Sequence, residues 1–236
     1  MGIDAIGWHT LVQYRKATEQ TLLCLGYPDL LVSEKQLLES MPALPPLAKD
    51  WEEVASGHSW RGKIFDTTEA LRKIGYNPKY IDIVNVRGIE HIVDLNKDIF
   101  ESLPYDHPIS NTRFDMVADF GTLEHCFNIG QAFMNLLYLA KPEGYVIHNN
   151  PTNRINHGFW NISPTAYFDF WNNVGATVEE CIFTGGGVNS PYVMQPDGIG
   201  FKRMWLKEEC NNIVVVKMPS SIPSGSGWPM QKKYTI

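Results

Sequence analysis

The sequence predicts an α/β fold in which helices cover a mostly parallel sheet. Apolar runs of strand length alternate along the chain with segments of helical spacing that begin at capping residues. The run 114–120 is followed by a polar break, by helical spacing over 129–140 and by a second apolar run at 145–148. This alternation is typical of parallel sheets covered by helices. Such sheets bind ligands at the carboxyl ends of their strands, where we expect the reactive groups.

The first hundred residues predict three helices and three strands. Ser33 and Asp66 stand where helix N-caps are expected, and Gly26 closes the first strand. The expected helices are 8–20, 33–41 and 66–74, and the expected strands are 21–26, 80–84 and 91–96.

The rest of the chain continues the pattern with two further helices and four further strands. The expected helices are 129–140 and 163–174, and the expected strands are 114–120, 145–148, 176–184 and 212–218. The last two strands have no obvious helix between them. A long excursion that contains glycines separates them instead, over 185–209.

Length and composition fit one large domain. The chain has 236 residues, 44% of them hydrophobic, which is enough to fill a core of that size. We expect the domain to span 1–218, with 42–61 as an insertion or lid and 219–236 as an irregular tail. The net charge of -6 argues against a nucleic-acid partner, because phosphate binding needs a basic face.

Cysteine usage and the N-terminal sequence favour a cytoplasmic protein. The cysteines stand far apart, form no CxxC pair and are expected to be reduced and buried: Cys24, Cys126, Cys181 and Cys210. The first residues lack the layout of a secretory signal, and no apolar run approaches the roughly 20 residues that a membrane span needs. We therefore expect no membrane partner, while self-association into a homo-oligomer stays open.

Two short motifs resemble a known family. Leu-Glu-His at 123–125 follows the run 114–120, and Lys-Pro-Glu-Gly at 141–144 separates the next helix from the next strand. Both motifs, at these positions in the order of elements, resemble those of class I S-adenosylmethionine-dependent methyltransferases. In that family the turn that corresponds to 141–144 often reads Lys-Pro-Gly-Gly. The resemblance covers about half of the chain well. It implies a Rossmann-like sandwich with a seven-stranded, mostly parallel sheet whose last strand is antiparallel.

The same resemblance implies S-adenosylmethionine as the cofactor. The backbone must approach the ligand closely after the first strand, and this chain offers Gly26 where the family has GxGxG. Asp82 would bind the ribose hydroxyls, and Asp94 with Asn96 would meet the adenine. The residues expected around the cofactor are Gly26, Asp29, Asp82, Asp94, Asn96, Gly121 and Leu123. The alternatives are a plain tight turn at Gly26, a salt-bridged or edge-exposed Asp82 and a helix N-cap at Asp94.

Glu124, His125 and His157 are expected to face the methyl acceptor. Methyl transfer from a sulfonium is an in-line displacement, so the protein aligns the acceptor and removes a proton where the acceptor carries one. A histidine titrates near neutral pH and suits that second task. In the alternative, this loop only lines the cofactor pocket, and the aromatic run after His157 is core packing. No metal site is expected, since these residues and His148 show no HxH or HExxH spacing.

The sequence therefore predicts a methyltransferase that acts on an oxygen or nitrogen of a small-molecule or sugar-like acceptor. A second hypothesis is a catalytically degenerate protein of the same fold that serves as a binding or assembly partner, because the first loop has a single glycine. A third is an enzyme of the same architecture that uses a nicotinamide or a nucleotide sugar.

Overall fold

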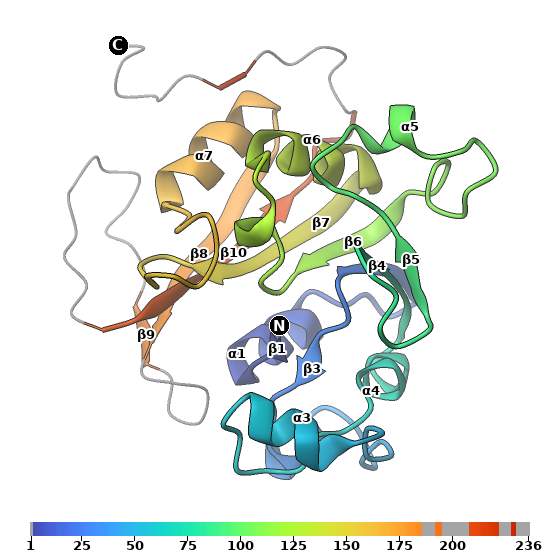
Figure 1. The fold of residues 1–236 in the computed structure, drawn as a ribbon, viewed down its shortest axis with the longest axis vertical. Coiled ribbons are helices and arrows are strands. Elements are labelled where there is room, and N and C mark those ends of the chain that lie inside the picture. The colour runs from blue at the N-terminus through green and yellow to red at the C-terminus, as the bar shows by residue number, and fades with distance from the viewer. Residues whose placement is uncertain (1, 186–191, 195–207, 222–227, 230–236) are drawn as a thin grey trace.

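A central sheet dominates the computed structural model, which describes residues 2–185, 192–194, 208–221 and 228–229 (Figure 1). Within these residues the strand order is β5-β4-β2-β6-β7-β10-β8-β9. The strands of this sheet are β2 (Gln20–Leu25), β4 (Tyr76–Asp82), β5 (Glu90–Ile92), β6 (Phe114–Asp119), β7 (Ala140–Pro151), β8 (Thr177–Gly185), β9 (Tyr192–Met194) and β10 (Cys210–Lys217). A separate parallel pair joins β1 (Gly2–Ile3) to β3 (Asp29–Leu30).

Strand directions confirm the predicted fold. Strands β5, β4, β2, β6 and β7 are parallel neighbours, and β10 lies between β7 and β8, antiparallel to both. Parallel neighbours need long crossover connections, which the helices supply. The protein therefore has the predicted Rossmann-like sandwich, with a mostly parallel sheet and an antiparallel last strand. The short strand β9 is one more than the seven predicted.

Helices cover both faces of this sheet (Figure 1). They are α1 (Ala5–Gln13), α2 (Glu34–Leu38), α3 (Trp51–Gly57), α4 (Thr67–Lys73), α5 (Ile99–Ser102), α6 (Ile129–Leu139) and α7 (Pro164–Asn173), with the short 3-10 helix η1 (Leu123–His125). Helices α5, α6 and α7 lie on one side of the sheet, and α1 and α4 lie on the other. Among the described residues, no helix combines the length and the apolar composition that crossing a bilayer requires.

Alternate side chains of the central strands enter two hydrophobic cores. In β2, Leu23 and Leu25 belong to the core beneath α6 and α7, whereas Leu22 and Cys24 belong to the core beneath α1 and α4. Side chains alternate along a strand, so a strand covered on both faces must be apolar throughout. This explains why β2 is apolar from Leu22 to Leu25. All four cysteines are buried and none is in a disulfide, as predicted.

Capping residues set the helix starts where the sequence predicts them. Ser33 and Gln36 form a capping box at α2, and the side chains of Asp66 and Ser163 cap α4 and α7. Gly75 follows α4 with a left-handed φ of 95°, which glycine adopts without strain. The first helix is less well predicted, because α1 ends at Gln13 and not near residue 20.

Strand β4 is longer than predicted. It begins at Tyr76 instead of Tyr80, although it contains Pro78. On one side, β4 pairs with β2 along almost its whole length. On its other side β4 pairs with β5 at residues 80–82 alone, so that side is unpaired within the sheet at Pro78. The missing N–H of Pro78 is tolerated because the strand borders an open edge there.

Strand β7 includes segments predicted as a turn and a loop. It runs through the Lys-Pro-Glu-Gly turn, where Glu143 takes a left-handed φ of 59°, and continues through Asn149 and Asn150. Strand β10 pairs with β7 from Tyr145 to Pro151 and so extends it. The asparagines therefore lie on a strand, which gives them a fixed direction.

Segment 42–61 contains α3, which packs within a small cluster of its own. Ala55 and Trp60 meet Leu31, Ala48 and Ile64 there. Its role as an insertion or lid stays a prediction, as does the domain span 1–218. Most of the predicted excursion over 185–209 and of the predicted tail lies outside the described residues.

Candidate functional site

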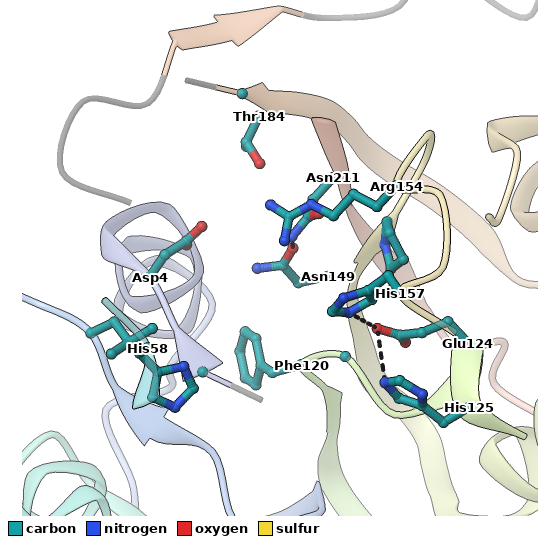
Figure 2. Close-up of a pocket in the computed structure, with 15 residues that line it drawn as sticks. Asp4, His58, Phe120, Glu124, His125, Asn149, Arg154, His157, Thr184 and Asn211 are labelled. Carbon is teal, nitrogen blue, oxygen red and sulfur yellow. Dashed lines mark hydrogen bonds and ion pairs between the residues drawn. The ribbon is translucent and has the colours of Figure 1, made fainter. Parts of the chain in front are cut away.

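A cavity of about 250 Å³ opens at the carboxyl ends of β6 and β7 (Figure 2). Its walls come from the N-terminal segment, the loop after β6, the end of β7 with the loop that follows, and the ends of β8 and β10. This is the edge at which open α/β sheets bind ligands.

Glu124, in η1, forms the buried part of one wall. Its side chain is 0% exposed, and its Oε2 accepts a 2.9 Å hydrogen bond from Asn150 Nδ2. Asn150 is itself held by the Tyr167 hydroxyl, which donates to its Oδ1 at 2.7 Å. Among the described residues, none donates a hydrogen bond to Glu124 Oε1. Burial, together with the charge of Asp119, raises the pKa of Glu124 to about 7.

His125 and His157 face that oxygen from two different loops (Figure 2). The distance from Glu124 Oε1 to Nε2 is 3.4 Å for His157 and 3.9 Å for His125. Partial burial lowers the pKa of both rings, and the pKa of His157 is lowered further by His125 and Arg154. Both imidazoles are therefore mainly uncharged at neutral pH. The structure thus brings together the three residues predicted to face the acceptor.

Main-chain contacts hold the loop after β7 against Glu124. The backbone N–H groups of Phe159 and Trp160 both donate to the Glu124 carbonyl, at 2.8 and 3.2 Å. A Cβ at Gly158 would lie 2.8 Å from the same carbonyl oxygen, which is closer than a Cβ carbon approaches an oxygen in proteins. Glycine at this position is what allows His157 to come near the carboxylate.

The aromatic run after His157 divides between the core and the surface. Tyr167, Phe170 and Trp171 are buried in the core beneath α6 and α7, as in the core-packing alternative. Phe159 is 65% exposed and meets Phe127 edge to face. Each ring of this exposed pair follows one of the two histidines by two residues in the sequence, and the pair offers an apolar surface.

A second acid–histidine pair fixes the start of η1 from within the core. Asp119 Oδ1 accepts hydrogen bonds from the backbone of Thr122 and Leu123. Its Oδ2 lies 3.1 Å from His148 Nδ1, and both side chains are fully buried. Trp171 donates to His148 Nε2 at 3.2 Å, so the ring proton belongs on Nδ1, which donates to Asp119. His148 is therefore committed to Asp119, and the structure does not group it with His125 and His157.

Three further residues that line the cavity are not among the predicted site residues: Asp4, Asn149 and Arg154. Asp4 caps α1 by accepting from Gly7 N at 2.7 Å, and burial raises its pKa. Arg154 and Asn149 face the same space (Figure 2). Only Asp4 has a local signal, since an aspartate before a helical segment is a common N-cap.

The residues predicted to hold the cofactor gather at the same edge of the sheet. Gly26 ends β2 with a φ of 73°, and Gly121 follows β6 with a φ of 91°. Asp82 is the last residue of β4, and Asp94 follows β5 by two residues. Because these four strands are parallel neighbours, their carboxyl ends meet at one edge. Of these residues, Gly121 alone also lines the cavity.

The carboxylates of this group are bonded within their own turns. Asp82 Oδ1 accepts from the backbone N–H of Ile83 at 2.6 Å. Asp94 Oδ1 accepts from the backbone and side chain of Asn96, which lowers the pKa of Asp94. Asp98 caps α5, so the alternative that Asp94 is a helix N-cap is wrong.

Two predicted cofactor residues have other contacts. The side chain of Leu123 is fully buried in the core beneath α6 and α7. The two oxygens of Asp29 pair with Arg87 Nη2 at 2.7 Å and with His58 Nε2 at 2.9 Å. Arg87 also lies over the ring of Tyr27, 5.0 Å from its centroid. Arg87 thereby links the loop after β4 to the loop after β2.

No model of a known protein family matches the sequence, and no curated protein matches it. Solved structures with a similar fold include the CurJ carbon methyltransferase (11% identity, TM-score 0.43, covering 89% of this chain and 51% of that chain). They also include the YcgJ protein from Bacillus subtilis (10% identity, TM-score 0.40, covering 91% of this chain and 98% of that chain). A third is an O-methyltransferase family protein from Burkholderia thailandensis (12% identity, TM-score 0.38, covering 91% of this chain and 57% of that chain). This chain spans about half the length of the CurJ chain. These likenesses concern the fold alone.

Proposed function

We propose that the protein is an S-adenosylmethionine-dependent methyltransferase acting on an oxygen or nitrogen of a small-molecule or sugar-like acceptor. One observation carries this proposal. Glu124, His125 and His157 share a cavity at the strand edge that also bears the predicted cofactor residues, and Gly121 belongs to both groups. A donor and an acceptor bound on the two sides of Gly121 would be held next to each other, as group transfer requires.

The residues at the strand ends fit the cofactor. Gly26 and Gly121 have no Cβ and take left-handed φ values, so their backbone can approach a ligand closely. Asp82 makes both of its backbone bonds through Oδ1, and its Oδ2 would bind the ribose hydroxyls. Asp94 and Asn96 would meet the adenine. When bound, S-adenosylmethionine supplies a methyl group activated by a sulfonium.

The cavity fits a small polar acceptor. Glu124 Oε1 and the uncharged rings of His125 and His157 can accept hydrogen bonds from a hydroxyl or amine and can take up its proton. Asn149 and Thr184 add amide and hydroxyl groups on the remaining walls (Figure 2). Side chains of this kind suit a polyhydroxylated or sugar-like molecule.

Calorimetric titration with S-adenosylmethionine, S-adenosylhomocysteine, NAD and a nucleotide sugar tests the proposal. We expect only the first two to bind. Asp82→Ala should weaken their affinity about tenfold, the value of one hydrogen bond to a charged group. Asp106→Ala, an exposed aspartate in the loop before β6, is the matched control and should change nothing. Binding of NAD or the nucleotide sugar instead, or equal affinity of Asp82→Ala, would contradict the assignment.

The link from Asp29 to Arg87 favours a second function, that of a catalytically degenerate binding or assembly partner. Gly26 begins the loop after β2, and Asp29 begins β3, which follows that loop. An ion pair ties Asp29 to the loop after β4. If this pair closes the donor site, the wild-type protein binds none of the four ligands. Donor binding by the Arg87→Ala variant then distinguishes two cases. The variant should bind S-adenosylmethionine if the ion pair blocks an existing donor site, and should not bind it if the protein has no donor site.

A further inference from the structure

Ligand atoms of Glu124, His125 and His157 converge closely enough to share one ion. One atom from each residue lies within 4.8 Å of the other two. Ligands at about 2.1 Å from a tetrahedral metal ion stand about 3.4 Å apart. The separation of Glu124 Oε1 and His157 Nε2 is 3.4 Å, which already matches. His125 Nε2, at 3.9 Å from the same oxygen, would need to approach it by about half an ångström. It would also need to approach the His157 nitrogen, which lies within 4.8 Å, and a half-exposed side chain can make this movement.

The carboxylate is held in place by contacts that leave one oxygen directed at the rings. Asn150 binds Oε2 and is fixed in turn by Tyr167. Oε1 is buried, accepts no hydrogen bond from the described residues and faces both histidines (Figure 2). Burying a carboxylate oxygen without a partner is costly. A cation bound at Oε1 would supply that partner, and Asn150 would act as the outer residue that orients a metal ligand.

We propose that Glu124, His125 and His157 bind one divalent first-row transition-metal ion of the Zn²⁺ type, with further coordination positions open to the cavity. Two imidazoles and one carboxylate form a ligand set typical of open metal sites. The sequence predicts no such site, because 32 residues separate His125 from His157. An ion here would bind an acceptor oxygen and lower its pKa. That consequence rests on the proposed function, whereas binding of the ion does not.

Titration of metal-free, untagged protein with Zn²⁺ by calorimetry and with Co²⁺ by visible absorption tests the site. We expect one ion per chain and, with Co²⁺, the d–d absorption of a protein-bound ion. His157→Ala and Glu124→Gln should each weaken Zn²⁺ binding at least about tenfold. His9→Ala removes an exposed histidine from α1 and is the matched control, with unchanged binding expected. Circular dichroism checks that each variant is folded.

Wild-type protein that binds neither ion overturns the proposal, and so do His157→Ala and Glu124→Gln variants that bind Zn²⁺ as tightly as the wild type. S-adenosylmethionine is titrated separately on the same preparations. Donor binding without Zn²⁺ binding removes the metal site alone. Zn²⁺ binding without donor binding removes the proposed methyl transfer and leaves the metal site in place.

Discussion

The two halves of the strand edge are organised in different ways. On the donor half, at the ends of β2, β4 and β5, Asp82 and Asp94 are bonded to groups within two or three residues along the chain. On the acceptor half, at the ends of β6 and β7, Glu124 is fixed by Asn150 and Tyr167, which are 26 and 43 residues away. Local turns shape the first half, and long-range contacts in the core shape the second.

This difference predicts where a substitution affects stability and where it affects binding alone. Polar groups in exposed turns can exchange their bonds for water at little cost. Polar groups in a buried network cannot, because each lost partner leaves another group unsatisfied. Substitutions in the acceptor half should therefore cost more free energy of unfolding than substitutions in the donor half.

The largest effect is expected for Asn150→Ala. It removes the partner of both Glu124 Oε2 and the Tyr167 hydroxyl inside the core, and should lower the free energy of unfolding by about 3 kcal/mol. Urea denaturation measures this loss. Asn111→Ala removes an exposed bond to the Tyr105 carbonyl and should cost less than about 0.5 kcal/mol. Equal losses in the two variants would show that the acceptor half has no special rigidity.

Gly158→Ala should come next, with a loss of about 1 to 2 kcal/mol. The new Cβ would lie 2.8 Å from the Glu124 carbonyl oxygen and would push the loop that carries His157 away. Zn²⁺ affinity, measured by calorimetry, should fall with it. Gly57→Ala at the end of α3 is the control, since its Cβ meets nothing within 4 Å, and it should be neutral or slightly stabilising. A neutral Gly158→Ala would mean that the loop is not held as the contacts indicate.

Asp115 offers a comparison at the opposite edge of the sheet, where β6 begins. Partial burial acts to raise the pKa of Asp115, but bonds from Thr21 and Lys141 outweigh it, so the folded-state pKa lies below 3.8. A lowered pKa stabilises the fold above the unfolded-state value, and this contribution is lost as the pH falls through the folded-state value.

Wild type should therefore exceed Asp115→Asn in stability by about 1 kcal/mol at pH 7. The gap should narrow as the pH drops below 3.8. Denaturant titrations at several pH values measure it. A gap that stays constant with pH would show that the charge of Asp115 contributes nothing.

The smallest change in stability is expected for Asp82→Ala. Within the part of the chain that the structure describes, its carboxylate bonds to the backbone of its own turn alone, and that backbone is exposed. The free energy of unfolding should change by less than about 0.5 kcal/mol, although donor affinity falls about tenfold. Thermal unfolding and calorimetry on one preparation separate the two effects. A stability loss as large as that of Asn150→Ala would erase the contrast between the halves.

Much of the fold could be predicted because its signals are local. The run 22–25 is apolar since both faces of β2 are covered. The side chains of Ser33 and Asp66 cap their helices by accepting hydrogen bonds from backbone N–H groups three residues further along the chain. Errors arose where a distant segment decided the outcome. Strand β7 continues to Pro151 because β10 pairs with it, and the sequence of 149–151 contains no signal that predicts this pairing.

The sequence by itself determined the α/β alternation, the buried cysteines and the residue types available at the strand ends. Only the tertiary structure decided which of them meet. Gly158 and two main-chain hydrogen bonds bring His157 to Glu124 across more than thirty residues. Asn150 bonds the same carboxylate from the end of β7, which pairs with β10. Helix and strand patterns reflect neighbours along the chain, whereas a site depends on contacts between residues far apart in sequence, whose positions are fixed only when the sheet and its helices pack.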